Sequence, residues 1–79
     1  MILDVFGTEE ALKVAFCESG LNPDAVGDKN TAYHSYGLFQ IRGLPGRPSA
    51  EWLLDPTNNI NYAYELYKKS GWEPWSCKS

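Results

Sequence analysis

The sequence predicts a small, mainly α-helical domain with a short irregular loop or hairpin between its two long helices. Apolar residues recur at helical spacing from Thr8 to Ser19 and again from Asp55 to Gly71. Residues 20–36, between these helices, are rich in Gly, Asn and Asp, which favours turns. The 79 residues are 43% apolar, which is enough to fold as one domain spanning 1–79. A chain of this length buries only about 60% of its unfolded surface, so the core is small.

The first long helix, Thr8 to Ser19, has clear boundary signals. Thr8 can cap its start, and Glu9 and Glu10 lie in the first turn, where the helix dipole favours negative charge. Gly20 follows the last residue as a natural stop. The face expected to be mostly apolar carries Ala11, Leu12, Ala15, Phe16 and Ser19.

Glu18 departs from these local rules. The C-terminus of a helix carries partial negative charge and favours cations, yet here a carboxylate lies beside Phe16 and Cys17. If this helix end is partly buried, desolvation and the dipole both raise the pKa of Glu18, which would let it donate a proton near neutral pH. The competing interpretation is a surface glutamate on a frayed helix end, the common case for an arbitrary glutamate.

The loop after this helix leads into an apolar run at 36–41, and a hairpin is expected around Gly27 and Asp28. Gly37 lacks a Cβ and would let the backbone approach a substrate closely. Gln40 is an uncharged donor and acceptor inside the apolar run, so it either satisfies a buried backbone group or faces a cleft. The side chains of this run expected in the core are Leu38, Phe39 and Ile41.

The second half of the chain predicts two further helices. Residues 43–48 hold two prolines and two glycines and form a connector, and a serine then caps a short helix over 49–54. The second long helix begins with Asp55 as cap and Pro56 at its first position, and ends before Gly71. We expect it to pack against the first long helix. Its residues at helical spacing are Ile60, Ala63, Tyr64 and Tyr67.

Charge and composition argue against several functions. The net charge is −3 and the longest basic run is Lys68-Lys69, so we expect neither a nucleic-acid partner nor a basic membrane-surface helix. No apolar segment approaches the roughly 20 residues that span a bilayer. Residues 1–6 are too short, and lack the basic region, to be a secretory signal. His34 is the single histidine, without a ligand cluster, so we expect no metal or other cofactor.

Two segments, residues 16–23 (FCESGLNP) and 35–41 (SYGLFQI), together resemble the lysozyme superfamily. They are similar to the helix-ending Glu-Ser, the Asn-Pro loop and the Gly-x-x-Gln-Ile segment of soluble lytic transglycosylase-type domains and of goose-type and chicken-type lysozymes. The similarity extends to 55–60 and 72–75, and so covers residues 8–77. It implies an α+β lysozyme-like fold in which the irregular loop lies beside a glycan cleft.

The resemblance gives Glu18 the role of general acid and base. Chicken-type lysozymes carry a second carboxylate at the position of Ser35, and a serine cannot act as a carboxylate nucleophile or electrostatic partner. This departure favours a lytic transglycosylase, in which one glutamate protonates the glycosidic oxygen and then helps the muramyl C6 hydroxyl close a 1,6-anhydro ring. Asp24 and Asp28 stay open as second carboxylates that position a water, as in goose-type lysozymes. Ser19 would orient Glu18 or bind the N-acetyl group.

The resemblance also implies aromatic residues near Glu18. Trp72 would lie against Glu18 and exclude water, and Trp75 would support Trp72 or offer a stacking face to a sugar. Either Tyr62 or Tyr64 could reach Glu18, although in a small domain such side chains are also ordinary core residues. The residues expected to bind substrate are Ser19, Ser35, Tyr36, Gly37, Gln40, Tyr62, Tyr64, Trp72 and Trp75.

Cys17 and Cys77 are open to two interpretations. They are either two free buried thiols of a reducing compartment or one disulfide that ties the first long helix to the C-terminus. Closing a loop of about 60 residues would stabilise the fold by roughly 4 kcal/mol in the chain-entropy model, a large share for so small a domain. Chicken-type lysozymes, by resemblance, also tether this helix to the C-terminal segment. We favour the disulfide.

The leading hypothesis is a monomeric enzyme that cleaves the β-1,4 MurNAc–GlcNAc bond of bacterial peptidoglycan glycan strands. It would be a lytic transglycosylase or a lysozyme, for instance a phage endolysin, in an extracellular, periplasmic or virion-associated setting. Without a signal peptide it would be cut from a larger protein or exported by another route. The rival is a non-catalytic glycan-binding or structural module of a phage tail or secretion apparatus, and a chitinase-like enzyme is a third reading. Glu18 favours an enzyme, because a binding module has no use for a destabilising carboxylate there.

Overall fold

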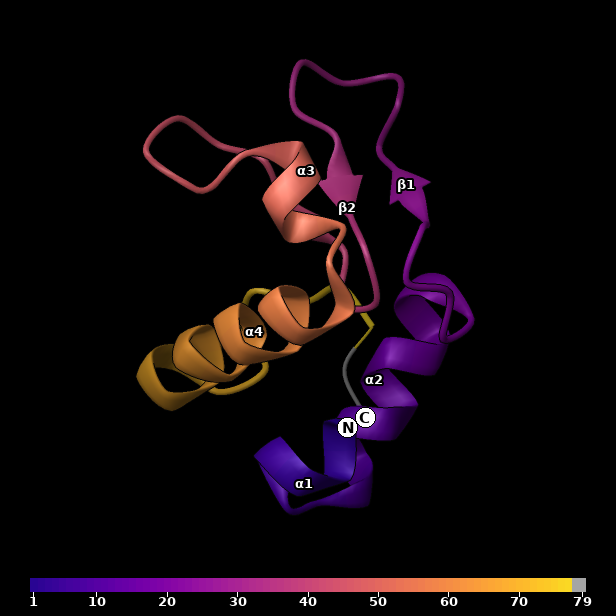
Figure 1. Ribbon diagram of the computed structural model, residues 1–79, viewed down its shortest axis with the longest axis vertical. Coiled ribbons are helices and arrows are strands. Elements are labelled where there is room, and N and C mark those ends of the chain that lie inside the picture. The colour runs from indigo at the N-terminus through magenta and orange to yellow at the C-terminus, as the bar shows by residue number, and fades with distance from the viewer. Residues whose placement is uncertain (78–79) are drawn as a thin grey trace.

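A computed structural model describes residues 1–77 as a mainly helical α+β domain, which confirms the predicted fold class. The strands β1 and β2 lie with α3 at one end of the molecule, and α1, α2 and α4 lie below them (Figure 1). None of the helices in this part of the chain has the length and apolarity needed to cross a membrane. In chain order the elements are α1 (Ile2–Phe6), α2 (Glu9–Ser19), β1 (Val26–Gly27), β2 (Ser35–Tyr36), β3 (Ile41–Arg42), α3 (Ala50–Leu53) and α4 (Pro56–Ser70).

The predicted starts of three helices, and the ends of two of them, are confirmed by their capping residues. The side chains of Thr8, Ser49 and Asp55 each accept a hydrogen bond from a backbone N–H in the first turn of α2, α3 and α4. Gly20 and Gly71 lie just past the last residues of α2 and α4, both with positive φ. Local capping chemistry therefore fixes where these helices begin and end.

Helix α1 is not among the predicted elements. It contacts both α2 and α4, and buried residues of all three helices belong to one hydrophobic core. Ile2 is buried, and the ring of Phe6 stacks on Phe39 with 5.2 Å between ring centroids. A five-residue helix without a side-chain cap carries too little periodicity to be recognised from sequence.

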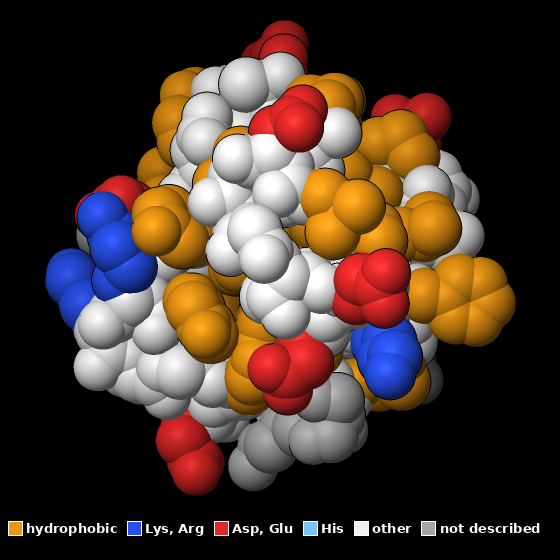
Figure 2. Space-filling model, turned by 90° about the horizontal axis from the view of Figure 1, so that it is seen from below, with side chains coloured by type: hydrophobic (Ala, Val, Ile, Leu, Met, Phe, Trp, Pro, Cys, Tyr) orange, Lys and Arg blue, Asp and Glu red, His pale blue; other side chains and the backbone are white. Residues whose placement is uncertain are grey.

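The buried face of α2 includes Val14, which was not predicted, and excludes Phe16, which was. Ala11, Val14 and Ala15 are at most 1% exposed, whereas the side chain of Phe16 is 65% exposed. The reason is geometric, because Phe16 follows Ala15 by one residue and is turned about 100° around the helix axis. On the face seen from below, hydrophobic side chains are interspersed with carboxylates and polar atoms (Figure 2). Leu38, Phe39 and Ile41 are buried as predicted.

The three strands form one antiparallel sheet in the order β1-β2-β3. Val26 pairs with Tyr36, and Tyr36 pairs with Ile41, so Tyr36 is the central residue of the sheet. The hairpin predicted around Gly27 and Asp28 is confirmed as the β1–β2 connection. The strand β3 was hidden from sequence reasoning, because two residues cannot show a period of two.

Asn59 on α4 connects the helical part to the sheet. It is fully buried, and its Oδ1 accepts a hydrogen bond from the Phe39 N–H at 2.8 Å. Its Nδ2 donates to the carbonyl oxygens of Tyr36 at 2.7 Å and Leu53 at 2.9 Å. One amide side chain thus satisfies three backbone groups from two different segments, so α4 fixes the turn at residues 37–40.

We expect Asn59→Leu to lower the free energy of unfolding by about 3 kcal/mol, because three buried backbone groups lose their partners. Asn61→Leu is the matched control, since it makes the same exchange at an exposed position of the same helix. Urea unfolding followed by tryptophan fluorescence measures both. A loss for Asn59→Leu no larger than that for Asn61→Leu would contradict the role given to Asn59.

Candidate active site

The predicted catalytic region borders a cavity of about 610 Å³. Its walls come from the end of α2, the sheet, the connector at 43–48, α4 and the segment that follows α4. Of the residues singled out from sequence, it brings together Glu18, Asp28, Ser35, Gln40 and Trp75. Segments that are far apart in the chain therefore contribute to a single concave surface.

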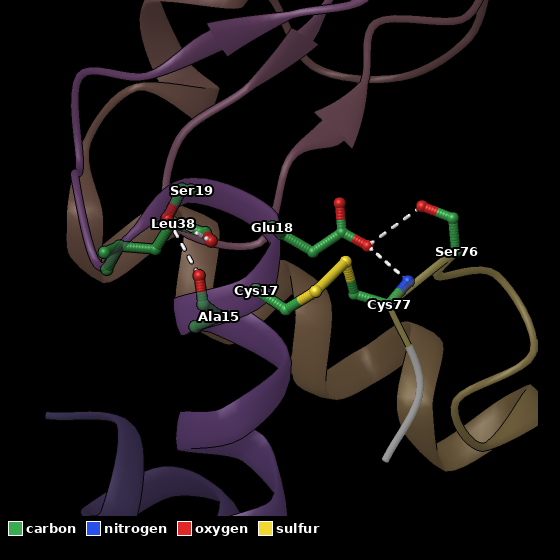
Figure 3. Close-up of a disulfide and its surroundings, with 7 residues drawn as sticks. All are labelled: Ala15, Cys17, Glu18, Ser19, Leu38, Ser76 and Cys77. Atoms are coloured by element: carbon green, nitrogen blue, oxygen red, sulfur yellow. Dashed lines mark hydrogen bonds between the residues drawn. A yellow bond between two sulfur atoms is a disulfide. The ribbon is translucent and has the colours of Figure 1, made fainter.

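Glu18 lies on the last turn of α2 and is half-buried. Its Oε2 accepts hydrogen bonds from the backbone N–H of Cys77 at 3.0 Å and from the hydroxyl of Ser76 at 3.3 Å. Figure 3 shows both bonds on the same oxygen, with the second carboxyl oxygen pointing away from Cys77. One oxygen is thus held by the chain, and the other is available for proton transfer.

A disulfide joins Cys17 to Cys77, with 5.8 Å between the Cα atoms. The residues next to the half-cystines are Glu18 and Ser76, which are themselves hydrogen-bonded. The bridge therefore brings the Cys77 N–H and the Ser76 hydroxyl to the carboxylate (Figure 3). The structure thus contains the predicted disulfide and not the alternative of two free thiols.

Ser19 does not contact Glu18. Its hydroxyl lies 2.8 Å from the carbonyl oxygen of Leu38 and 3.1 Å from that of Ala15, on the opposite side of the helix end from Glu18 (Figure 3). The hydroxyl is thus engaged with backbone carbonyls, and Ser19 is not among the residues that line the cavity. Ser19 therefore fastens the end of α2 to the turn at residues 37–40, which corrects the expected role in orienting Glu18.

Gln40 combines the two alternatives that its sequence left open. Its Nε2 donates to the carbonyl oxygens of Gly37 at 2.9 Å and Ala25 at 3.1 Å, and the residue also lines the cavity. A Cβ at Gly27 would collide with Gln40 Oε1. The glycine in β1 thus makes room for the side chain that forms part of the cavity wall.

Gly37 is required by packing, which corrects its expected role in admitting a substrate. Its φ of 78° is in the left-handed region, and its Cβ position is taken by Asn59 Nδ2 and the Leu53 carbonyl oxygen. The residue is buried beneath α4 and is not part of the cavity wall. Neither is Tyr36, whose ring lies 6.4 Å from that of His34.

Asp28 is the second carboxylate on the cavity wall. Its Oδ2 accepts a hydrogen bond from the hydroxyl of Ser35, which is 3% exposed, and lies 3.2 Å from Arg42 Nη2. The Ser35 hydrogen bond, followed by the contact with Arg42, lowers the pKa of Asp28, so this carboxyl is ionised at neutral pH. Asp24, the other candidate, is exposed and not in the cavity wall.

The two tryptophans after α4 contact each other, with 5.3 Å between ring centroids, so Trp75 supports Trp72 as one of the two expected alternatives. Trp75 lines the cavity, but it is only 4% exposed, and its Nε1 donates to the Phe39 carbonyl oxygen at 2.8 Å. It is a wall residue without an open stacking face. Trp72 lies away from Glu18, because Phe6 of α1 stacks on it at 5.5 Å and Tyr67 approaches at 4.5 Å.

Tyr62 and Tyr64 on α4 contact aromatic rings that lie outside the cavity wall. Tyr64 contacts Phe6 at 5.2 Å between ring centroids, and Tyr62 contacts Trp52 at 6.1 Å. Leu66 is the residue of α4 that lines the cavity, one turn after Tyr62. The cavity therefore meets α4 beyond Tyr62, and neither tyrosine belongs to its wall.

Sequence reasoning missed Arg42, Arg47 and Ser76 as cavity residues. The signal for the arginines was present, because one cation precedes the proline- and glycine-rich connector next to the Gln-Ile segment and another lies within it. Ser76 had a signal too, since it precedes a cysteine that pairs with the residue next to Glu18. Across residues 1–77, no group of His, Cys, Asp and Glu side chains could hold a metal ion.

A small α+β domain with a half-buried glutamate on a cavity wall is the arrangement expected of a lysozyme-like protein. The family described as "Lysozyme like domain" matches residues 6–77, and the chain belongs to this family. Its sequence is also similar to curated proteins named membrane-bound lytic murein transglycosylase C. That of Serratia proteamaculans (strain 568) is 41% identical over 66 residues, covering 71% of this chain and 18% of the relative.

The protein of the same name from Yersinia enterocolitica is 38% identical over 66 residues, again covering 71% of this chain and 18% of the relative. The chain thus spans 18% of the length of these curated relatives. No solved structure matches this chain. The relatives therefore support the family assignment.

Proposed function

We propose that this domain cleaves the β-1,4 bond between MurNAc and GlcNAc in peptidoglycan and works as a lytic transglycosylase, with Glu18 as its single acid and base. The observation that carries the proposal is the placement of Glu18 on the cavity wall with one carboxyl oxygen held by Ser76 and Cys77. The names of the two relatives, which describe lytic murein transglycosylases, support the same class of reaction. The disulfide is consistent with a location outside the cytoplasmic membrane, where this substrate also lies.

In the proposed reaction, protonated Glu18 donates its proton to the glycosidic oxygen. The bond between this oxygen and C1 of MurNAc breaks, and GlcNAc leaves with a free 4-hydroxyl group. The Glu18 carboxylate then accepts the proton of the MurNAc C6 hydroxyl as that oxygen bonds to C1. The product ends in 1,6-anhydro-MurNAc, and no water is consumed, so one carboxyl group suffices.

Hydrolysis is the second candidate, and Asp28 favours it. Its ionised carboxylate lies on the same cavity wall as Glu18, held by Ser35 and Arg42. Such a group can accept a proton from a water that attacks C1. Chicken-type lysozymes carry a carboxylate at the position of Ser35. Here the Ser35 hydroxyl instead donates a hydrogen bond to the carboxylate of Asp28, which follows the neighbouring strand β1. The two candidates differ in the product and in their need for Asp28.

Mass spectrometry of the sugars released from purified peptidoglycan tests the proposal, with wild type and Asp28→Asn run side by side. Products ending in 1,6-anhydro-MurNAc, formed by both proteins, are the expected result. Reducing MurNAc ends that disappear in Asp28→Asn would instead establish hydrolysis. Binding to peptidoglycan without release of any sugar would identify a non-catalytic glycan-binding module and overturn the proposal.

A further inference from the structure

Two of the charges on the cavity wall are not paired with each other. Among the described residues, four charged side chains line the wall, namely Glu18, Asp28, Arg42 and Arg47. Arg42 and Asp28 form an ion pair, with 3.2 Å between Nη2 and Oδ2. Glu18 is held by neutral donors, and Arg47 has no carboxylate partner among the ion pairs of the described chain. A cation without a counter-charge thus faces a cavity in a protein of net charge −3.

The guanidinium of Arg47 is held in place by neutral contacts. Its Nη1 donates to the Arg42 carbonyl oxygen at 3.0 Å. Its central carbon lies 6.0 Å from the ring centroid of Tyr62, whose ring in turn meets Trp52. These contacts use one of five N–H donors and one face of the guanidinium plane, so the remaining donors can bind a ligand.

We infer that Arg47 binds a carboxylate carried by the MurNAc residue and thereby makes the site select muramyl glycans over neutral chitin. The inference rests on the proposed glycan substrate. A guanidinium binds a carboxylate through two parallel hydrogen bonds, which add geometric specificity to the charge attraction. A chain built from GlcNAc alone carries no carboxylate, so only the muramyl glycan gains this contact.

Two groups on peptidoglycan carry this chemistry. On a peptide-free strand the carboxylate is that of the lactyl group itself, and on a substituted strand it belongs to the stem peptide attached there. Both carry the same chemical group and extend from the same sugar, but the stem-peptide carboxylate lies farther from the ring because the lactyl carboxyl is then an amide. Arg42 is the poorer candidate, because binding a ligand anion would require it to leave Asp28.

The test measures binding rather than cleavage, so that it stays informative whether or not the domain is catalytic. All proteins carry Glu18→Gln, and calorimetry gives the Kd for peptide-free muramyl glycan, peptide-bearing muramyl glycan and a chitin oligomer of equal length. Arg47→Gln is expected to weaken binding of a muramyl glycan about 10- to 100-fold and to leave chitin binding unchanged. Arg47→Lys should restore part of the loss, because it keeps the charge but not the planar fork.

Lys13→Gln is the matched control, since it removes the same charge from an exposed position on α2, outside the cavity wall. A loss confined to the peptide-bearing glycan would identify the stem peptide as the source of the carboxylate. A loss confined to the peptide-free glycan would identify the lactyl group, whose carboxyl is an amide in the peptide-bearing glycan. A loss with both muramyl glycans would show that Arg47 binds either carboxylate. Equal losses for muramyl and chitin ligands, or no loss in Arg47→Gln, would overturn the inference. Absence of sugar release by the wild-type protein would bear on the proposed function alone.

Discussion

Glu18→Gln is expected to lower the rate of sugar release from peptidoglycan by about 10²- to 10⁴-fold, the range associated with general acid–base catalysis. Glutamine can neither donate the proton that the glycosidic oxygen needs nor accept the proton of the C6 hydroxyl. Its amide oxygen can still accept the hydrogen bond from the Cys77 N–H, so the fold should be retained. The rate is measured as soluble muropeptides released per unit time, with thermal unfolding as a check on folding.

Glu9→Gln provides the comparison, because it makes the same chemical change at the exposed start of the same helix. This variant should lose stability by a few tenths of a kcal/mol through the helix dipole, and its rate should stay within about twofold of wild type. A Glu18→Gln protein that folds and cleaves as fast as Glu9→Gln would remove Glu18 from the chemistry. The search for an acid would then move to Asp28, the other carboxylate of the cavity wall.

The helices could be predicted because their signals are local. Thr8, Ser49 and Asp55 each cap the element that follows them, and a cap depends only on the next three residues. Helix α1 has no such cap, and its effect is long-range, because it places Phe6 between Phe39 and Trp72. No local sequence pattern indicates a long-range contact between aromatic rings such as this one.

The same distinction explains which site residues were found. Glu18 was singled out because a carboxylate at a helix C-terminus departs from a local rule, and it was assigned a role because residues 16–23 and 35–41 resemble the lysozyme superfamily. The cavity wall contains it. Trp72 was assigned to Glu18 on the resemblance alone, without knowledge that α1 would stack on it. Asp28 was one of two open candidates, and only the pairing of β1 with β2 brings it to Ser35.

Removing the disulfide is expected to have the second large effect, on stability and on activity together. The double substitution Cys17→Ser/Cys77→Ser should lower the free energy of unfolding by about 4 kcal/mol, since the bridge closes a loop of 60 residues. A domain of this size has a total stability of about 5–10 kcal/mol, so the loss is a large part of it. Urea unfolding of the oxidised and reduced wild type and of the double variant measures the effect. Reductant should change the wild type and leave the double variant unchanged.

The activity of the double variant should fall as well, under conditions where it remains folded, because the bridge holds two donors on the carboxyl oxygen of Glu18. Ser76→Ala separates the two effects, since it removes one of these donors and leaves the disulfide intact. If positioning matters, Ser76→Ala lowers kcat with little change in unfolding free energy, and the double variant lowers kcat further. An oxidised and a reduced protein of equal kcat would show that the bridge stabilises the fold without acting on Glu18.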